Sequence, residues 1–325
     1  MSNLEKDPEE LIVEPTSAAP VSIEVLEPRD VPLGGPRAMT VRRTLPQRGR
    51  SLIGAWCFAD HYGPDDVSTT GGMHVPPHPH TGLQTVSWLF AGEIEHRDST
   101  GAHAMVKPGE LNLMTAGGGI QHSEVSTQGT TVLHGVQLWT VMPDSHRHGE
   151  PFFENYVPPI IDHQGALVSV FLGSLLGQTS AATAFTPIVG AQLDLPANTT
   201  ITVPVETSFE HGLLVDSGDV VLDGTSVPIA SIGYRAPGAA ELLITTGAEP
   251  ARVVLLGGEP FGEQIIMWWN FIGRDHDEVV QYRETWMADV IADTTTEGQF
   301  GHVDGYEGRA LPAPVLPLGR LRPRD

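Results

Sequence analysis

Short hydrophobic runs, each ended by turn residues, dominate the pattern of this chain. Residues 83–90 (LQTVSWLF) are rich in β-branched and aromatic side chains and are followed by Ala91-Gly92. Residues 131–142 form a similar run that Pro143 ends, and shorter runs fill a block from about Ala191 to Gly257. Strands this short, separated by frequent turn signals, are typical of a sandwich or barrel. The pattern therefore predicts an all-β fold.

One segment near the end of the chain has a helical period instead. Asp275 can act as an N-cap, and Glu278 follows three residues later. Apolar side chains then recur at helical spacing, at Val279, Tyr282, Trp286 and Val290. We expect a short helix whose aromatic stripe packs on the β-structure.

Length and composition support two β domains. The chain has 325 residues, of which 40% are hydrophobic, which is enough for a sizeable core. Its 36 glycines and 27 prolines suit many turns between strands. A Pro-Gly turn that enters a strand occurs at Pro108-Gly109 and again at Pro237-Gly238. This recurrence hints at two barrels of similar plan.

The net charge, the absence of a long apolar run and the N-terminal residues indicate which partners and which cellular location to expect. The 40 acidic residues outnumber 18 basic ones, which gives a net charge of −22 and disfavours direct contact with nucleic acid. No apolar run is long enough to span a membrane, and the first ten residues do not resemble a secretory signal. The single cysteine, Cys57, excludes an intrachain disulfide. We expect a soluble cytoplasmic protein.

Histidines cluster in the first half of the chain. Seven of the 14 fall between His61 and His122. In His78-Pro79-His80 the two imidazoles stand at i and i+2, so they share one face of a strand. His122 and Glu124 repeat this spacing 42 residues after His80.

Two such pairs on neighbouring strands can converge on one point. Three imidazoles and one carboxylate suit Fe, Mn, Ni, Cu or Zn better than Ca or Mg. For either pair alone, surface histidines beside an ordinary hairpin would be an adequate explanation. The combination of both pairs favours a mononuclear metal site formed by His78, His80, His122 and Glu124.

The same alternation, carried past His80, places four more side chains on that interior face. They are Gln84, Val86, Trp88 and Phe90. Trp88 and Phe90 would then offer a flat apolar wall to a substrate, although packing in the core is the role that such residues more often have. His61, His96 and His103 are candidates for orienting the ligands from behind.

Several segments resemble the pirin family of the cupin superfamily. Residues 78–86 (HPHTGLQTV), 95–101 (EHRDSTG), 114–124 (MTAGGGIQHSE) and 133–139 (LHGVQLW) fit that family in order. The resemblance covers roughly residues 37 to 275. It implies a bicupin, that is, two antiparallel β-barrels of jelly-roll type, here with a short C-terminal helix.

The resemblance also implies two barrels and a metal, and the composition of the two ends of the chain adds a tail at each end. We expect a disordered acidic tail over residues 1–20, a metal-binding barrel over 21–145, a barrel without metal ligands over 146–275, and a helix with a Pro- and Arg-rich tail over 276–325. In the block from Ala191 to Gly257 the single histidine, His211, cannot repeat the ligand set. In this family the metal is usually iron, which makes Fe(II) the expected ion.

The resemblance implies quercetin 2,3-dioxygenase activity, in which O2 opens a flavonol ring and carbon monoxide leaves. The expected partners are thus a flavonol or catechol-like substrate and O2, and Glu124 is the candidate general base. Pirins usually have Glu where this chain has Gln84, which puts the identity of the substrate in doubt. A different cupin reaction also fits the ligands. The non-enzymatic alternative is a metal-dependent regulatory protein that binds a transcription factor or a metabolic enzyme.

Overall fold

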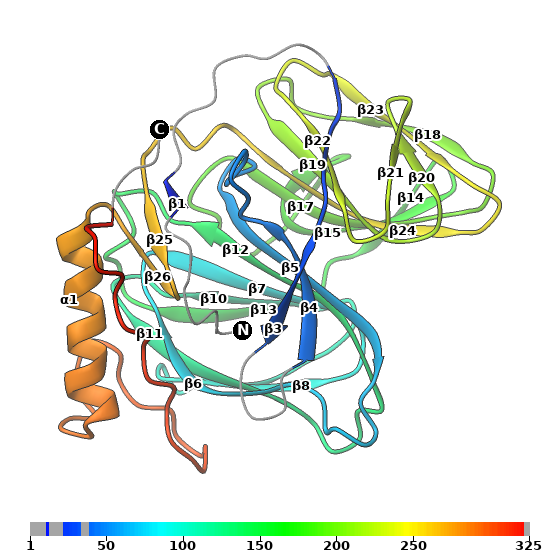
Figure 1. The fold of residues 1–325 in the computed structure, drawn as a ribbon. Helices are drawn as coiled ribbons and strands as arrows, with labels where there is room; N and C mark the ends of the chain where they lie inside the picture. The colour runs from blue at the N-terminus through cyan, green and yellow to red at the C-terminus, as the bar shows by residue number, and fades with distance from the viewer. Residues whose placement is uncertain (1–10, 13–21, 34–38, 322–325) are drawn as a thin grey trace.

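The computed structural model describes residues 11–12, 22–33 and 39–321, and these are built mainly from antiparallel sheets (Figure 1). The acidic tail expected over residues 1–20 lies outside the described residues, except for β1 (Leu11–Ile12). Two halves lie side by side in Figure 1, and the single α-helix flanks the N-terminal half.

Two sheets form the N-terminal half. In spatial order, the strands of the seven-stranded sheet are β13 (Phe152–Tyr156), β10 (Leu111–Thr115), β7 (Leu83–Ala91), β12 (Val132–Val141), β5 (Trp56–Asp66), β4 (Met39–Leu45) and β3 (Arg29–Leu33). Those of the four-stranded sheet are β6 (His74–His80), β11 (Ile120–Ser126), β8 (Ile94–Asp98) and β9 (His103–Val106).

The C-terminal half repeats this plan around its own core. Its larger sheet consists of β14 (Ile160–His163), β15 (Ala166–Leu175), β17 (Ile188–Leu195), β24 (Ala251–Gly258), β19 (Glu210–Ser217), β22 (Ile232–Arg235) and β2 (Glu24–Leu26), with β16 (Gln178–Thr179) beside β15. Its smaller sheet consists of β18 (Thr200–Pro204), β23 (Glu241–Thr246), β20 (Val220–Leu222) and β21 (Thr225–Val227).

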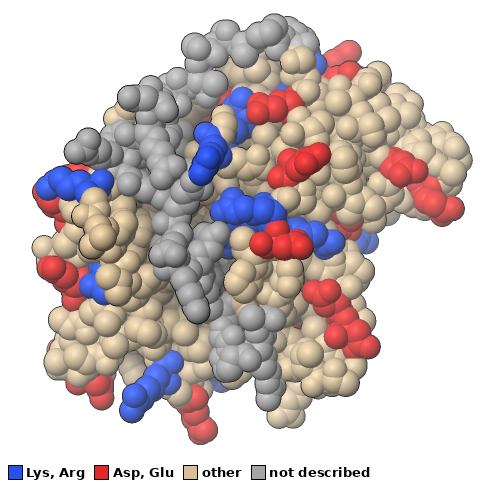
Figure 2. Space-filling view, viewed as in Figure 1, with Lys and Arg blue, Asp and Glu red and all other residues tan. Residues whose placement is uncertain are grey.

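The predicted fold class is confirmed, with a refinement of its geometry. The chain is all-β apart from a short C-terminal helix, and each half is a pair of facing sheets of jelly-roll type rather than a closed barrel. No helix among the described residues is long and apolar enough to cross a membrane. Figure 2 shows acidic side chains spread over both halves of one face, with several basic side chains between them.

The central strands β10, β7 and β12 of the seven-stranded sheet are buried on both faces, whereas the edge strands β13 and β3 are partly exposed. Along β7 and β12, one set of alternate side chains packs against the C-terminal half, as Trp88 does against Phe171 with ring centroids 4.8 Å apart. The Trp88 indole also donates to Gln192 of β17 at 2.7 Å. The other set of side chains faces the four-stranded sheet of its own half. β7 is therefore buried on both faces along most of its length, including its polar residues Gln84, Thr85 and Ser87.

The helix α1 (His276–Trp286) begins where the sequence predicts. Asp275 accepts a hydrogen bond from the backbone N–H of Glu278 at 2.9 Å, and Val279, Tyr282 and Trp286 are buried. The helix continues into a π-helical turn, η1 (Met287–Ile291). Its aromatic stripe packs on a small sheet of β1, β25 (Ile266–Trp268) and β26 (Phe271–Gly273).

The Pro- and Arg-rich end of the chain docks on this helix as far as the structure describes it. Trp286 Nε1 donates to the carbonyl of Leu311 at 2.8 Å, and Arg283 Nε donates to that of Pro314 at 2.6 Å. The N–H of Leu311 in turn donates to the carbonyl of Pro77, just before the histidine pair on β6. This segment therefore covers the outer side of the strand that carries His78 and His80.

Strand pairing crosses the domain boundary expected at residues 145 and 146. The strand β2, from the N-terminal region, pairs with β22 of the C-terminal half. The strand β13, which follows the first block of strands, returns to pair with β10 of the N-terminal half. The boundaries at 145 and 275 stay a prediction, and each half completes one sheet edge with a strand from the far side of the first boundary.

The packing of Trp88 gives a test of the interface between the halves. Trp88→Phe removes a buried hydrogen bond to Gln192 and part of the indole, so we expect the free energy of unfolding to fall by about 1–3 kcal/mol. Urea denaturation measures this. Because Trp88 faces away from the histidines, the metal content of the variant should equal that of the wild type. A normal stability with lost metal would contradict this orientation.

Candidate metal centre

Strands β6 and β11 bring three predicted ligands together. The two strands pair antiparallel, with His122 opposite His78 in the register. One ring nitrogen from each of His78, His80 and His122 lies within 4.8 Å of the others, and all three side chains are fully buried. His80 Nε2 and His122 Nε2 are 3.1 Å apart. The i, i+2 spacing on a strand thus produces the convergence that the sequence predicts.

Neighbouring groups orient the outer nitrogen of two of these rings. His78 Nδ1 is 2.8 Å from the carbonyl of Pro76, and His78 Nε2 is buried without a hydrogen-bond partner among the described residues. His122 Nδ1 is 3.4 Å from His96 Nδ1, and His96 Nε2 is 3.0 Å from Asp98 Oδ2. An imidazole held at one nitrogen presents the other in a fixed direction, as in most protein metal sites.

Glu124 lies beside His122. One carboxylate oxygen of Glu124 is within 4.8 Å of a ring nitrogen of His122 and of His96. Where β11 pairs with β6, the register shifts between His122 and Glu124 because β6 has one extra residue between Val75 and His78, so Glu124 keeps the regular alternation of β11 with His122. Ser87 Oγ of β7 is 3.3 Å from Glu124 Oε1. The carboxylate is therefore positioned from the opposite sheet as well.

Burial keeps the three imidazoles neutral. Desolvation lowers the pKa of His78, His80 and His122 well below the ordinary value, and the neighbouring histidines lower it further. A neutral imidazole keeps a nitrogen lone pair for a metal ion. Three such nitrogens and a carboxylate in a buried site fit a transition metal ion.

One part of the sequence-based interpretation is wrong. The side chains predicted to continue the face of His78 and His80 lie instead on the interface side of β7; they are Gln84, Val86, Trp88 and Phe90. Gln84 Nε2 donates to Thr115 Oγ1 at 2.9 Å and to the carbonyl of Thr183 at 3.1 Å, and Trp88 packs between the halves.

The cause is a break in the strand. Thr81-Gly82 separates β6 from β7, which belong to different sheets. Gly82 has a φ of +69°, and a Cβ there would lie 2.7 Å from the carbonyl oxygen of Ile272, so only glycine fits this turn. Alternation cannot be carried across such a turn. Gln84 therefore lies on the interface side of its strand, and Ser87, of the opposite parity, faces Glu124.

The wall that does face the ligands comes from β5, β7 and β12. It includes Ser87, Tyr62, Gln137 and Trp139, all buried. The ring of Trp139 lies edge-on to His80 with centroids 5.1 Å apart, and Ser87 Oγ is 2.9 Å from Gln137 Oε1. Burial raises the pKa of the Tyr62 phenol, and the charges of Glu124 and Asp60 raise it further. The sequence pattern does not identify these residues, because the face of the strand that lies toward the histidines depends on how the two sheets stack.

Of the three histidines considered as supports, only His96 lies beside the ligands. His103 is largely exposed and pairs with Glu95 at 2.7 Å. His61 belongs to another buried cluster between the halves, where His61 Nε2 and His134 Nε2 lie 2.6 and 2.5 Å from Asp216 Oδ1. His134 and Asp216 were not predicted, since only the folded chain brings β12 and β19 together.

His61, His134 and Asp216 form a hydrogen-bonded cluster between the two halves, called the clamp below. Burial favours a raised pKa for Asp216, but the hydrogen bonds from His134 and His61 outweigh it and hold that pKa well below the ordinary value. Arg252 Nη1 lies 3.4 Å from the other carboxylate oxygen, and the charge of Arg42 contributes to the lowered pKa of His61. Two nearby guanidinium groups disfavour a divalent cation here. The clamp therefore joins the halves and is distinct from the candidate metal centre.

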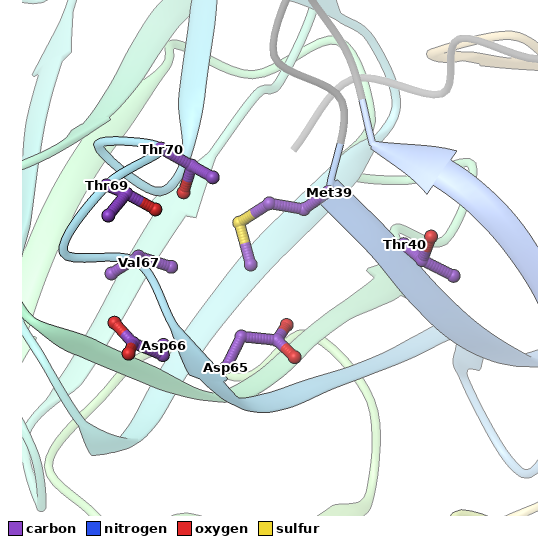
Figure 3. Close-up of a pocket in the computed structure, with 7 residues that line it drawn as sticks. All are labelled: Met39, Thr40, Asp65, Asp66, Val67, Thr69 and Thr70. Atoms are coloured by element: carbon purple, nitrogen blue, oxygen red, sulfur yellow. The ribbon is translucent and has the colours of Figure 1, made fainter.

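A separate surface pocket of about 560 Å³ lies at the ends of β4 and β5 (Figure 3). Its lining consists of Met39, Thr40, Asp65, Asp66, Val67, Thr69 and Thr70. Asp66 Oδ1 already accepts hydrogen bonds from the N–H and hydroxyl of Ser68. None of the clustered histidines lines this pocket, so its chemistry is distinct from that of the buried centre.

Two family models match separate parts of the chain. Residues 38–140 match the Pirin family model, and residues 190–291 match the model described as the Pirin C-terminal cupin domain. A Pseudomonas aeruginosa protein is 37% identical over 292 residues, which cover 89% of each chain. This chain belongs to the pirin family.

Individual relatives of this pirin carry two kinds of name. The Pseudomonas protein is named, provisionally, as a quercetin 2,3-dioxygenase. A pirin-like protein of Caulobacter vibrioides is 33% identical and covers 76% of this chain and 88% of its own. The crystal structure of a quercetin 2,3-dioxygenase from Acinetobacter baumannii superposes with a TM-score of 0.85 at 36% identity, covering 91% of this pirin and 96% of that chain. Such relatives imply a metal cofactor for the family.

The support of His122 by His96 and Asp98 can be tested directly. Asp98→Asn weakens the hydrogen bond that orients His96, and His96→Ala removes the group behind His122. We expect each variant to bind metal about 10–100-fold more weakly than wild type, since partners of this kind commonly contribute that much. Competition with a chelator of known affinity measures it. His103→Ala, at an exposed position, is the matched control and should leave the affinity unchanged.

His211 in the C-terminal half gives an acid-stability test. Burial lowers its pKa to about 4, and neither ring nitrogen has a hydrogen-bond partner among the described residues. The unfolded chain binds a proton on this ring below about pH 6.5, whereas the folded chain does so only near pH 4. Protonation of His211 therefore does not affect stability at pH 7. As the pH falls from about 6.5 toward 4, proton binding by the unfolded chain lowers the free energy of unfolding.

At pH 4.5 the expected penalty from His211 is about 2–3 kcal/mol. Relative to wild type, His211→Leu should thus gain that amount in free energy of unfolding between pH 7 and pH 4.5. Urea denaturation at both pH values measures the difference. An equal change for both proteins would show that His211 is protonated in the folded state.

Proposed function

We propose that this pirin binds one transition metal ion through His78, His80, His122 and Glu124, and acts as a dioxygenase on flavonols such as quercetin. The observation that carries the proposal is the convergence of three buried imidazoles beside a carboxylate. The similarity to the Pseudomonas and Acinetobacter proteins named as quercetin 2,3-dioxygenases supports the choice of reaction.

The chemistry divides between the ion and the protein. A bound metal would supply Lewis acidity, which lowers the pKa of a flavonol hydroxyl. Glu124 then accepts the hydroxyl proton as a general base, and Ser87, 3.3 Å from Glu124 Oε1, holds the carboxylate in place. His96 and Asp98 keep His122 oriented while this proton moves. The buried site excludes bulk water from the electron-rich flavonolate that meets O2.

The identity of the ion rests on the family and the donor set. We propose Fe(II), and the same four groups also suit Mn, Ni, Cu or Zn. A cytoplasmic location and the absence of contact with nucleic acid remain predictions from the sequence, as does any protein partner.

The ligand assignment is tested by His122→Ala. This variant removes the imidazole that lies beside both His80 and Glu124, so we expect the purified protein to lose at least about nine tenths of its metal. Mass spectrometry of metal content measures this, with His134→Ala as a buried histidine control outside the centre. Full occupancy in His122→Ala would contradict the assignment.

The reaction is tested by O2 consumption and carbon monoxide release from quercetin with the iron-loaded protein. We expect both in equal amounts. Glu124→Gln should lower kcat by about 10²–10⁴-fold, the usual contribution of a general base. Metal analysis of this variant separates lost chemistry from lost metal. If the iron-loaded wild type consumes no O2 with any flavonol or catechol, the dioxygenase proposal fails. The metal-dependent regulatory role then takes its place if the oxidation state of the metal changes the affinity for a protein partner.

A further inference from the structure

Three hydrogen-bond donors on the wall opposite the metal ligands have no partner among the described residues. They are the Tyr62 hydroxyl, Gln137 Nε2 and Trp139 Nε1, and the three side chains are at most 1% exposed. Buried donors are nearly always paired in folded proteins. Three on one wall of one site therefore call for an explanation.

The register of the sheet places these donors together. Gln137 and Trp139 are two residues apart on β12, so they share a face. Tyr62 on β5 lies opposite Gly135 of β12, two residues before Gln137 on that same face. A Cβ at residue 135 would come within 2.9 Å of the Tyr62 hydroxyl, so glycine makes room for the phenol to lie across β12. The three donors thus form a row over one face of β12, with the Tyr62 hydroxyl reaching over Gly135 from the neighbouring strand β5.

Contacts around the row fix where each side chain lies. The Gln137 carbonyl oxygen is 2.9 Å from Ser87 Oγ, which leaves its N–H groups directed elsewhere. Trp139 stacks on Phe58 with centroids 4.0 Å apart and meets His80 edge-on. Ser87 also approaches Glu124, so the row and the ligand set meet at one hydroxyl.

The row is not explained by the stability of the fold. An unpaired buried donor destabilises a protein by about 1–3 kcal/mol, and a phenylalanine at position 62 would avoid this. Buried groups that lower the stability of the fold and make no compensating contact within the protein are characteristic of binding sites. The donors face a region where the chain already collects three neutral imidazoles and a carboxylate.

We propose that Tyr62, Gln137 and Trp139 form a binding wall that donates hydrogen bonds to the oxygen atoms of an aromatic ligand held at the metal centre. This inference rests on the proposed function and names the residues that select its substrate. The wall offers donors at three points and an aromatic edge at His80 and Trp139. It suits a flat molecule with several carbonyl or phenolate oxygens, which a flavonol provides.

The test measures binding without turnover. Quercetin is titrated under nitrogen into the iron(II)-loaded wild type and into Tyr62→Phe, Gln137→Met and Trp139→Phe, and the change in its absorption spectrum gives Kd. We expect each variant to bind about 3–10-fold more weakly, as for the loss of one buried hydrogen bond. Metal content should remain at the wild-type level in all three.

Stability supplies a second readout that separates binding from structure. In metal-free protein, Tyr62→Phe should leave the urea midpoint unchanged or raise it, because the lost hydroxyl has no protein partner. The matched control is Tyr282→Phe, whose hydroxyl donates to Glu278 at 2.8 Å. That control should lower the urea midpoint and leave the Kd for quercetin unchanged.

The outcomes distinguish this inference from the function on which it rests. If the wild type binds no quercetin, both the flavonol proposal and the wall fail. If the wild type binds and all three variants bind within twofold of it, only the wall fails. A midpoint that falls in Tyr62→Phe as far as in Tyr282→Phe also overturns it, since the phenol would then be structural.

Discussion

Burial of the central strands of the seven-stranded sheet on both faces is the constraint on which the rest of the molecule depends. Strands such as β7 and β12 must present one set of side chains to the core between the halves and the other set to the candidate metal centre. Trp88 and Ser87 show the division, since Trp88 bonds to Gln192 of the C-terminal half and Ser87 lies near Glu124. A one-residue slip in register would exchange these two surfaces completely. Packing between the halves therefore also fixes the orientation of the site.

The sequence predicts local geometry well and the relation between sheets poorly. The pairs His78/His80 and His122/Glu124 could be read as converging because each lies within one strand, where alternation holds. The same rule failed at Gln84 and Trp88 because Thr81-Gly82 lies between. The clamp of His61, His134 and Asp216 was beyond prediction, since it joins residues up to 155 positions apart across the two halves. The docking of Leu311 on Pro77 likewise depends on a contact that only the tertiary fold supplies.

Two buried polar systems in the molecule illustrate opposite solutions to one electrostatic problem. At the interface, Asp216 is satisfied by two imidazoles and by Arg252, so the charges are balanced by the protein itself. At the metal centre, the imidazoles are neutral and their nitrogens face one another at distances as short as 3.1 Å. At the interface, two imidazoles and a guanidinium surround one carboxylate, whereas the candidate centre gathers neutral imidazole nitrogens, which suit a transition metal ion. Histidines and carboxylates thus hold the two halves together at the interface, and at the candidate metal centre the same residue types are arranged to suit a metal ion.

The exchange of strands between the halves has a consequence for how such a protein can evolve. Each large sheet ends on a strand contributed from across the chain, β2 in one and β13 in the other. A gene fragment cut near residue 145 would encode halves that each expose an unpaired sheet edge, which invites association with other chains. Duplication or shuffling of a single half is therefore disfavoured.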